Sequence, residues 1–122
     1  MMQDEFNQQL FNFLTAATTP FNAVAEMTKR LLAGGFTRLA DDTEWGIEVG
    51  GRYFLTRNDS SIVALIAGQD SPPTEGIRMV GAHTDSPCLM VKPNPEIRAQ
   101  GLFQLGVQVY GGALLNPWFD RD

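Results

Sequence analysis

The single histidine of this 122-residue chain, His83, occupies a position where a catalytic or metal-binding residue could lie. It follows the apolar run of residues 77–82, and Asp85 stands two residues further on. In open α/β sheets, ligands bind beyond the carboxyl ends of strands. An imidazole there can bind a metal through one ring nitrogen while a carboxylate accepts a hydrogen bond from the other, which fixes the tautomer. Because residues two apart in an extended segment project to the same side, His83 and Asp85 are a candidate pair of this kind.

A purely structural interpretation is also open and, on spacing alone, is favoured. His83 would then form a hydrogen bond at a strand end, and Asp85 would cap a turn before Pro87. A catalytic zinc needs about three protein ligands and a water. One histidine and scattered acidic residues do not supply such a set. The terminal carboxylates of Asp120 and Asp122 could contribute or could simply be solvated.

Other groups of residues are weaker candidates for a functional site. A thiol–imidazole pair between Cys88 and His83 is conceivable. The sequence places no third residue to orient it, and a lone cysteine is usually a small buried hydrophobe. The glycine pairs at residues 50–51 and 111–112 lack the spacing of a phosphate loop and indicate turns.

Two helices are expected to precede the strands that position these residues. Apolar side chains recur at helical spacing over residues 4–17. A second helix is expected to begin at Pro20, with Thr19 as its N-cap. It should end at the glycines at positions 34 and 35, which can adopt the left-handed conformation.

Strands are expected over the rest of the chain. Residues 36–39 form a short one, and residues 52–57 and 61–67 form a hairpin around a turn at 58–60. Residues 77–82 predict an interior strand that ends at His83, and residues 102–110 predict another. Two prolines exclude residues 92–95 from a central strand. Helices followed by strands indicate an α/β or α+β fold, with a possible boundary near Lys92.

Composition and charge exclude several classes of protein. Nine basic and fourteen acidic residues give a net charge of −5, and the bases are scattered. A nucleic acid or an anionic membrane is therefore a poor partner. No apolar run approaches the roughly 20 residues of a membrane helix, and the acidic start is unlike a secretory signal. We therefore expect a cytoplasmic protein.

Longer motifs outweigh these spacings. Residues 79–89 with 91–93, which contain His83 and Asp85, closely resemble a motif of the aspartyl-aminopeptidase family of zinc metallopeptidases. Residues 106–112 and 118–122 are similar to the family's next motif. Matches in the same order continue upstream at residues 19–21, 23–24, 35–36, 45, 51–53, 56–58 and 60–62. Asn22 departs from the histidine that the family commonly has after Pro-Phe, so no role is carried to it.

The resemblance implies a fold and a site. Residues 1–92 would be the N-terminal part of the catalytic α/β domain of a dinuclear zinc peptidase, built from a sheet and helices. Residues 93–122 would begin a mainly β inserted dimerisation domain. Family members are several times longer, and of their metal ligands only His83 matches here. Asp85 resembles the carboxylate that orients this histidine, and Asp120 and Asp122 receive no catalytic role.

The implied activity is removal of an N-terminal residue, typically Asp or Glu, from peptides with a free N-terminus. Two Zn²⁺ ions (Co²⁺ or Mn²⁺ being possible) would activate a water, with a glutamate as general base. The full-length protein is expected to form homo-oligomers, and this chain alone is expected to be inactive. In the alternative interpretation, the chain is a truncated, non-catalytic binding or assembly module.

Overall fold

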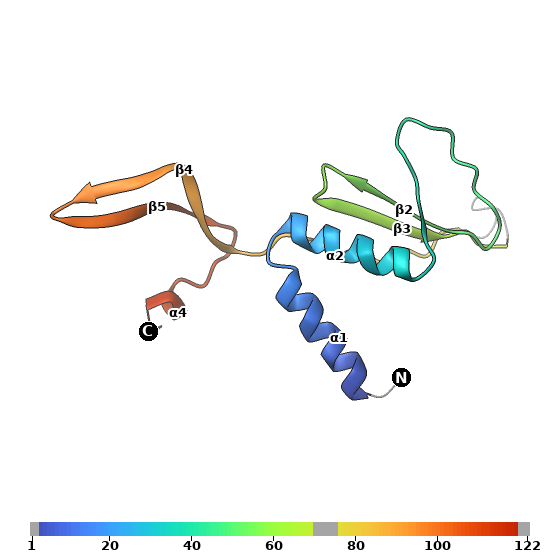
Figure 1. Ribbon diagram of the computed structural model, residues 1–122, viewed down its shortest axis with the longest axis horizontal. Coiled ribbons are helices and arrows are strands. Elements are labelled where there is room, and N and C mark those ends of the chain that lie inside the picture. The colour runs from blue at the N-terminus through green and yellow to red at the C-terminus, as the bar shows by residue number, and fades with distance from the viewer. Residues whose placement is uncertain (1–2, 70–75, 120–122) are drawn as a thin grey trace. The chain divides into compact units, whose positions relative to one another are not determined.

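The computed structural model describes residues 3–69 and 76–119, and the chain divides into two compact units (Figure 1). The first is Met1–Thr84 and the second is Asp85–Asp122. The two compact units divide between Thr84 and Asp85, whereas the domain boundary expected between residues 92 and 93 lies inside a strand, β4 (Cys88–Ala99). The assignment of the two parts to a catalytic domain and an inserted domain remains a prediction.

Both predicted helices are present, as α1 (Gln3–Ala16) and α2 (Pro20–Ala33). Thr19 caps α2 from an extended conformation, and its hydroxyl accepts a hydrogen bond of 3.1 Å from the backbone N–H of Asn22. Pro20 takes the first helical position, where its missing N–H has no cost. At the other end, Gly35 adopts the left-handed conformation with φ +77°, which terminates the helix as expected.

A three-stranded sheet follows the helices in the first unit. β1 (Thr37–Arg38) pairs parallel with β2 (Arg52–Arg57), which pairs antiparallel with β3 (Ser61–Ile66). Helix α2 contacts β3. The buried residues that the structure describes all belong to α2 and β2: Ala23, Val24, Tyr53 and Phe54.

The predicted hairpin is confirmed, and its turn has a demanding geometry. Asn58 and Asp59 both have positive φ, of 48° and 51°, and the N–H of Ser60 donates to the carbonyl of Arg57 over 3.1 Å. Positive φ at both central residues defines a type I′ turn, which matches the right-handed twist of the strands. Asparagine tolerates this conformation well. Asp59 occupies the second central position of the turn, where glycine is preferred because it has no side chain to strain.

Replacing Asp59 by glycine is therefore expected to stabilise the protein. Relief of left-handed strain at Asp59 contributes about 1 kcal/mol. The greater freedom of glycine in the unfolded chain offsets about half of that. The urea midpoint should rise by the equivalent of about 0.5 kcal/mol, whereas Asp59→Ala should not raise it. A lower midpoint for Asp59→Gly would contradict the assigned turn.

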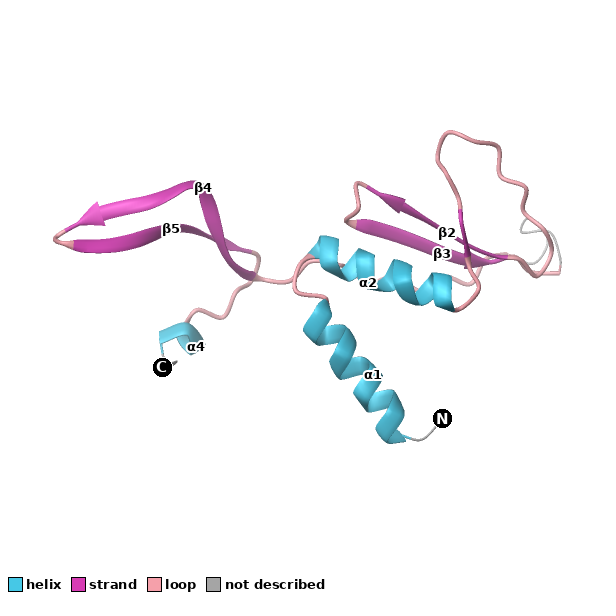
Figure 2. Cartoon of the chain, viewed as in Figure 1, coloured by secondary structure: helices cyan, strands magenta, loops and turns pink. Residues whose placement is uncertain are grey.

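The prediction of an interior strand over residues 77–82 is wrong for this structure. The segment is drawn as a loop in Figure 2 and has no strand assignment. Its large side chains are exposed, with Ile77 at 74%, Met79 at 83% and Val80 at 100%. An apolar run becomes a strand only when another strand supplies backbone hydrogen bonds. Among the described residues, no strand pairs with this segment.

The second unit is a two-stranded ribbon followed by a short helix, α4 (Asn116–Phe119). The strand predicted at residues 102–110 is confirmed as β5 (Leu102–Tyr110), antiparallel to β4. The sequence did not predict β4, which runs through the prolines at positions 93 and 95. The register shifts between Val91 and Glu96, so the prolines lie in an irregular stretch where no ladder donor is required.

Candidate metal-binding segment around His83

His83 lies in an exposed loop that is tied to the hairpin of the first unit. The next residue, Thr84, donates a hydrogen bond of 2.8 Å from its hydroxyl to the backbone carbonyl of Ser60. Ser60 closes the type I′ turn between β2 and β3, so the loop is attached to a geometrically restricted turn. His83 itself is exposed. The Thr84 contact therefore anchors the backbone beside the histidine and leaves the histidine at the surface of its unit.

Asp85 is held by the end of β5. The hydroxyl of Tyr110 donates to Oδ2 of Asp85 over 2.6 Å, and both residues are half-buried. This hydrogen bond, and the negative charge of Asp85 itself, raise the pKa of Tyr110 above its ordinary value of 10.0. Burial and Cys88 contribute further to the rise in this pKa. Tyr110 is therefore a protonated donor at neutral pH.

The other candidates of the sequence are placed as follows. Cys88 is a half-buried free cysteine that begins β4 and pairs across the ribbon with Tyr110. Asp120 and Asp122 lie outside the described residues. His83 belongs to the first unit and Asp85 to the second, so the orientation of the histidine by Asp85 remains a prediction from their spacing.

The donor chemistry of this segment fits zinc, but the number of donors does not complete a site. An imidazole nitrogen is an ordinary zinc ligand, and a carboxylate commonly accepts its second N–H. Within residues 3–69 and 76–119, no group of three or more His, Cys, Asp or Glu side chains is placed to hold a metal ion. His83 would therefore be one ligand of a larger set.

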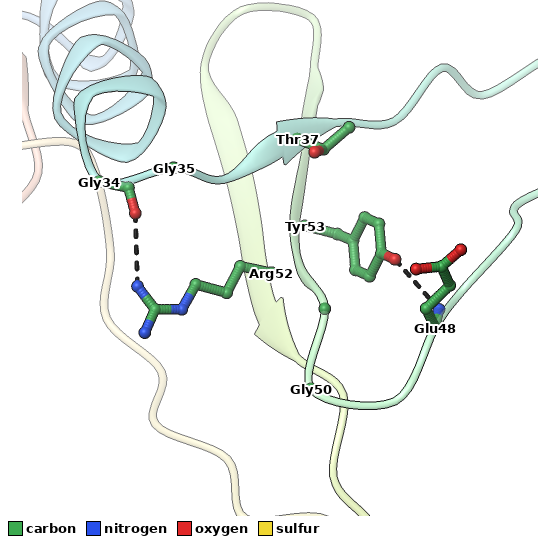
Figure 3. Close-up of a pocket in the computed structure, with 8 residues that line it drawn as sticks. Gly34, Gly35, Thr37, Glu48, Gly50, Arg52 and Tyr53 are labelled. Carbon is green, nitrogen blue, oxygen red and sulfur yellow. Dashed lines mark hydrogen bonds between the residues drawn. The ribbon is translucent and has the colours of Figure 1, made fainter.

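A separate depression of about 460 Å³ lies in the first unit (Figure 3). At one side, the guanidinium of Arg52 donates to the carbonyl of Gly34 over 3.4 Å. At the other, the hydroxyl of Tyr53 accepts from the N–H of Glu48 over 3.0 Å. The bond from Arg52 joins the end of α2 to β2, and the bond to Tyr53 joins the loop before β2 to that strand. His83 and Asp85 are not among the residues that line this depression.

Sequence reasoning missed the parts played by Thr84 and Tyr110. Thr84 stands between two singled-out residues but has no distinctive spacing of its own. Tyr110 is 25 residues from Asp85, and only the strand register brings it close. The one available signal was a hydroxyl-bearing aromatic residue at the predicted end of a strand.

No membrane-spanning helix is found in the part of the chain that the structure describes, since none is both long and apolar enough.

Comparison with known protein families shows to which family this chain belongs. The model of the family described as aminopeptidase I zinc metalloprotease (M18) matches residues 13–122, a stretch that includes His83, Asp85 and Tyr110. The chain belongs to the M18 family. This confirms the resemblance to the aspartyl-aminopeptidase family, and the membership covers the segments that carry the motifs. The family's description as a zinc metalloprotease supports zinc as its metal.

Curated M18 relatives match almost the whole chain. A probable M18 family aminopeptidase 2 of Pseudomonas syringae pv. tomato is 63% identical over 121 residues. The protein with the same description from Pseudomonas fluorescens is 60% identical over the same length. In both cases the match covers 99% of this chain and 28% of the relative. The chain thus spans about 28% of the length of the curated M18 proteins it matches.

Solved structures of M18 aminopeptidases share the fold. The chain aligns with a structure of Chaetomium thermophilum mApe1 at a TM-score of 0.83 and 37% identity, covering 93% of this chain and 26% of that one. A structure of the Ape4 and Nbr1 complex aligns at 0.85 and 39% identity, covering 94% and 22%. A structure of the S. cerevisiae mApe1 dodecamer aligns at 0.80 and 27%, covering 94% and 27%. The mixed α/β fold expected from the sequence is therefore that of the M18 aminopeptidases.

Proposed function

We propose that this chain is the N-terminal segment of a zinc-dependent aminopeptidase and that His83 binds one of its metal ions. The observation that carries the proposal is the match of residues 13–122 to the M18 family model. The identity of 63% over 121 residues to a probable M18 aminopeptidase supports it. A full-length protein, that is, a chain of the relatives' length that carries this sequence, would supply the metal ligands that the described residues lack.

Within that protein, His83 would hold a metal through one ring nitrogen, and Asp85 would accept a hydrogen bond from the other. Such a bond fixes the tautomer and makes the imidazole a better donor to the metal. The tie of Thr84 to Ser60 would hold the backbone beside the histidine in place. The described residues do not complete a metal site by themselves.

Finer features of the activity are part of the same proposal. The site would hold two zinc ions and act on peptides with a free N-terminus, preferring an N-terminal Asp or Glu. The protein would work in the cytoplasm as a homo-oligomer. The solved mApe1 dodecamer, to which this chain is similar, supports oligomerisation.

The proposal is tested with the purified full-length protein and a matched pair of peptides. One peptide begins with a free Asp, and the other has the same sequence with an acetylated N-terminus. Zinc-dependent release of Asp from the free peptide alone is the expected result. Cleavage of both peptides at an internal bond would reject an aminopeptidase, and no cleavage of either in the presence of zinc would reject the proposed release of an N-terminal Asp.

The 122-residue chain by itself is expected to release no amino acid from an Asp-peptide. A catalytic zinc needs about three protein ligands, and the described residues bring no such group together. The measurement compares Asp release by the purified chain at several concentrations with that of the full-length protein, both supplied with zinc. Metal-dependent release that rises in proportion to the concentration of the short chain would overturn this expectation.

A further inference from the structure

We propose that Tyr110 is a positioning residue of the aminopeptidase site. Its hydroxyl would hold the Asp85 carboxylate in the orientation in which Asp85 serves His83. The inference rests on the proposed function, because it presupposes that His83 binds zinc. The observation behind it is the hydrogen bond of 2.6 Å from Tyr110 to Oδ2 of Asp85, which lies wholly within the second unit.

The Tyr110 hydroxyl is carried by the end of a paired strand in the β4–β5 ribbon. Tyr110 is the last residue of β5 and lies opposite Cys88, the first residue of β4. The next pair, Leu89 with Val109, continues the same register. Asp85 precedes Cys88 by three residues, so the tyrosine side chain reaches back from the ladder to the incoming chain. A donor carried on a paired strand keeps its position better than a donor on a loop.

The backbone on both sides of this contact is also restricted. Gly111 follows Tyr110 with φ +63°, a conformation that favours glycine. Pro87 lies against it, with its ring atoms 3.6 Å from the point that a Cβ of Gly111 would occupy. The proline ring fixes the φ angle of Pro87, which limits the path from Asp85 into β4. The chain entering the ribbon is thereby packed against the chain leaving it.

The hydrogen bond that Tyr110 donates to Oδ2 suits a positioning role. An O–H donor to a carboxylate forms one of the stronger hydrogen bonds in proteins, and 2.6 Å is within its usual range. An ionised carboxylate has about four acceptor sites on its two oxygens. The bond from Tyr110 therefore limits rotation of the Asp85 carboxylate. Loss of the hydroxyl would loosen Asp85 without removing its charge.

The test uses Tyr110→Phe in the full-length protein, with zinc affinity measured by competition against a chelator. Loss of a residue that supports a metal ligand typically lowers metal affinity 10–100-fold, and we expect about tenfold because Tyr110 acts through Asp85. Tyr53→Phe is the matched control. It removes the chain's other tyrosine hydroxyl, which lies in the first unit, and should leave zinc affinity unchanged. The thermal midpoint of the zinc-free protein is recorded for each variant.

A double-mutant cycle separates positioning from a general structural effect. In an Asp85→Ala background, Tyr110→Phe should cause no further loss of zinc affinity. Unchanged affinity in the single variant would overturn the inference, and so would an equal loss in both backgrounds. A wild-type protein that binds no zinc would instead reject the proposed function, and this is established before the variants are compared.

Discussion

The full-length protein with His83→Ala is expected to lose about one zinc ion per chain and more than about 100-fold of its aminopeptidase activity. Loss of a group that only supports a metal ligand already costs 10–100-fold in affinity or activity. Loss of the ligand itself should exceed that range. His83 is the only histidine of this segment, so no other imidazole of the segment can replace it. Metal content by elemental analysis and the initial rate of Asp release measure the two effects.

The control for this experiment is Asp42→Ala. Asp42 is an exposed carboxylate in the loop between β1 and β2, and we expect its loss to change neither zinc content nor rate. The thermal midpoint of each zinc-free variant shows whether the fold is kept. A His83→Ala protein with unchanged zinc content would show that His83 is not a metal ligand.

Truncation of Phe54 is expected to have the largest effect on stability. Phe54 is fully buried, with 0% of its surface exposed, in the middle of β2. Replacing a buried phenylalanine by alanine typically costs about 3–5 kcal/mol, from lost transfer energy and the cavity left behind. Since domains are stable by only about 5–15 kcal/mol, a large part of the stability would be lost. The urea midpoint of the full-length protein measures the change.

Arg57→Ala is a matched control on the same strand. The guanidinium of Arg57 pairs with the carboxylate of Asp41 over 3.0 Å, but its side chain is 70% exposed. Exposed ion pairs contribute about 0–1 kcal/mol. Phe54→Ala should therefore lower the urea midpoint several times more than Arg57→Ala. Equal shifts for the two variants would contradict the core assigned to the first unit.

Much of the first unit could be predicted because its signals are local. Thr19 and Pro20 mark the start of α2 through one side chain and one fixed φ angle, and Gly35 marks its end. The turn residues at positions 58–60 join two runs rich in β-forming residues. Each of these features depends on neighbours within a few positions. Sequence patterns therefore located them correctly.

The errors arose where pairing decides the structure. Residues 77–82 have the composition of an interior strand, but composition cannot supply the neighbouring strand that such a run requires. Conversely, β4 forms in spite of its prolines, because a ribbon with a single partner strand and an irregular stretch tolerates missing donors. The bond between Tyr110 and Asp85 depends on the same long-range register. His83 became a candidate ligand through a motif, whereas the contacts of its neighbours Thr84 and Asp85 required the fold.

The most direct test of the metal assignment is a crystal structure of the full-length protein with anomalous diffraction measured at the zinc absorption edge. We predict a zinc peak about 2.0–2.1 Å from a ring nitrogen of His83, the usual zinc–imidazole distance. A zinc ion found elsewhere in a fully loaded protein, with no zinc in contact with His83, would contradict the account.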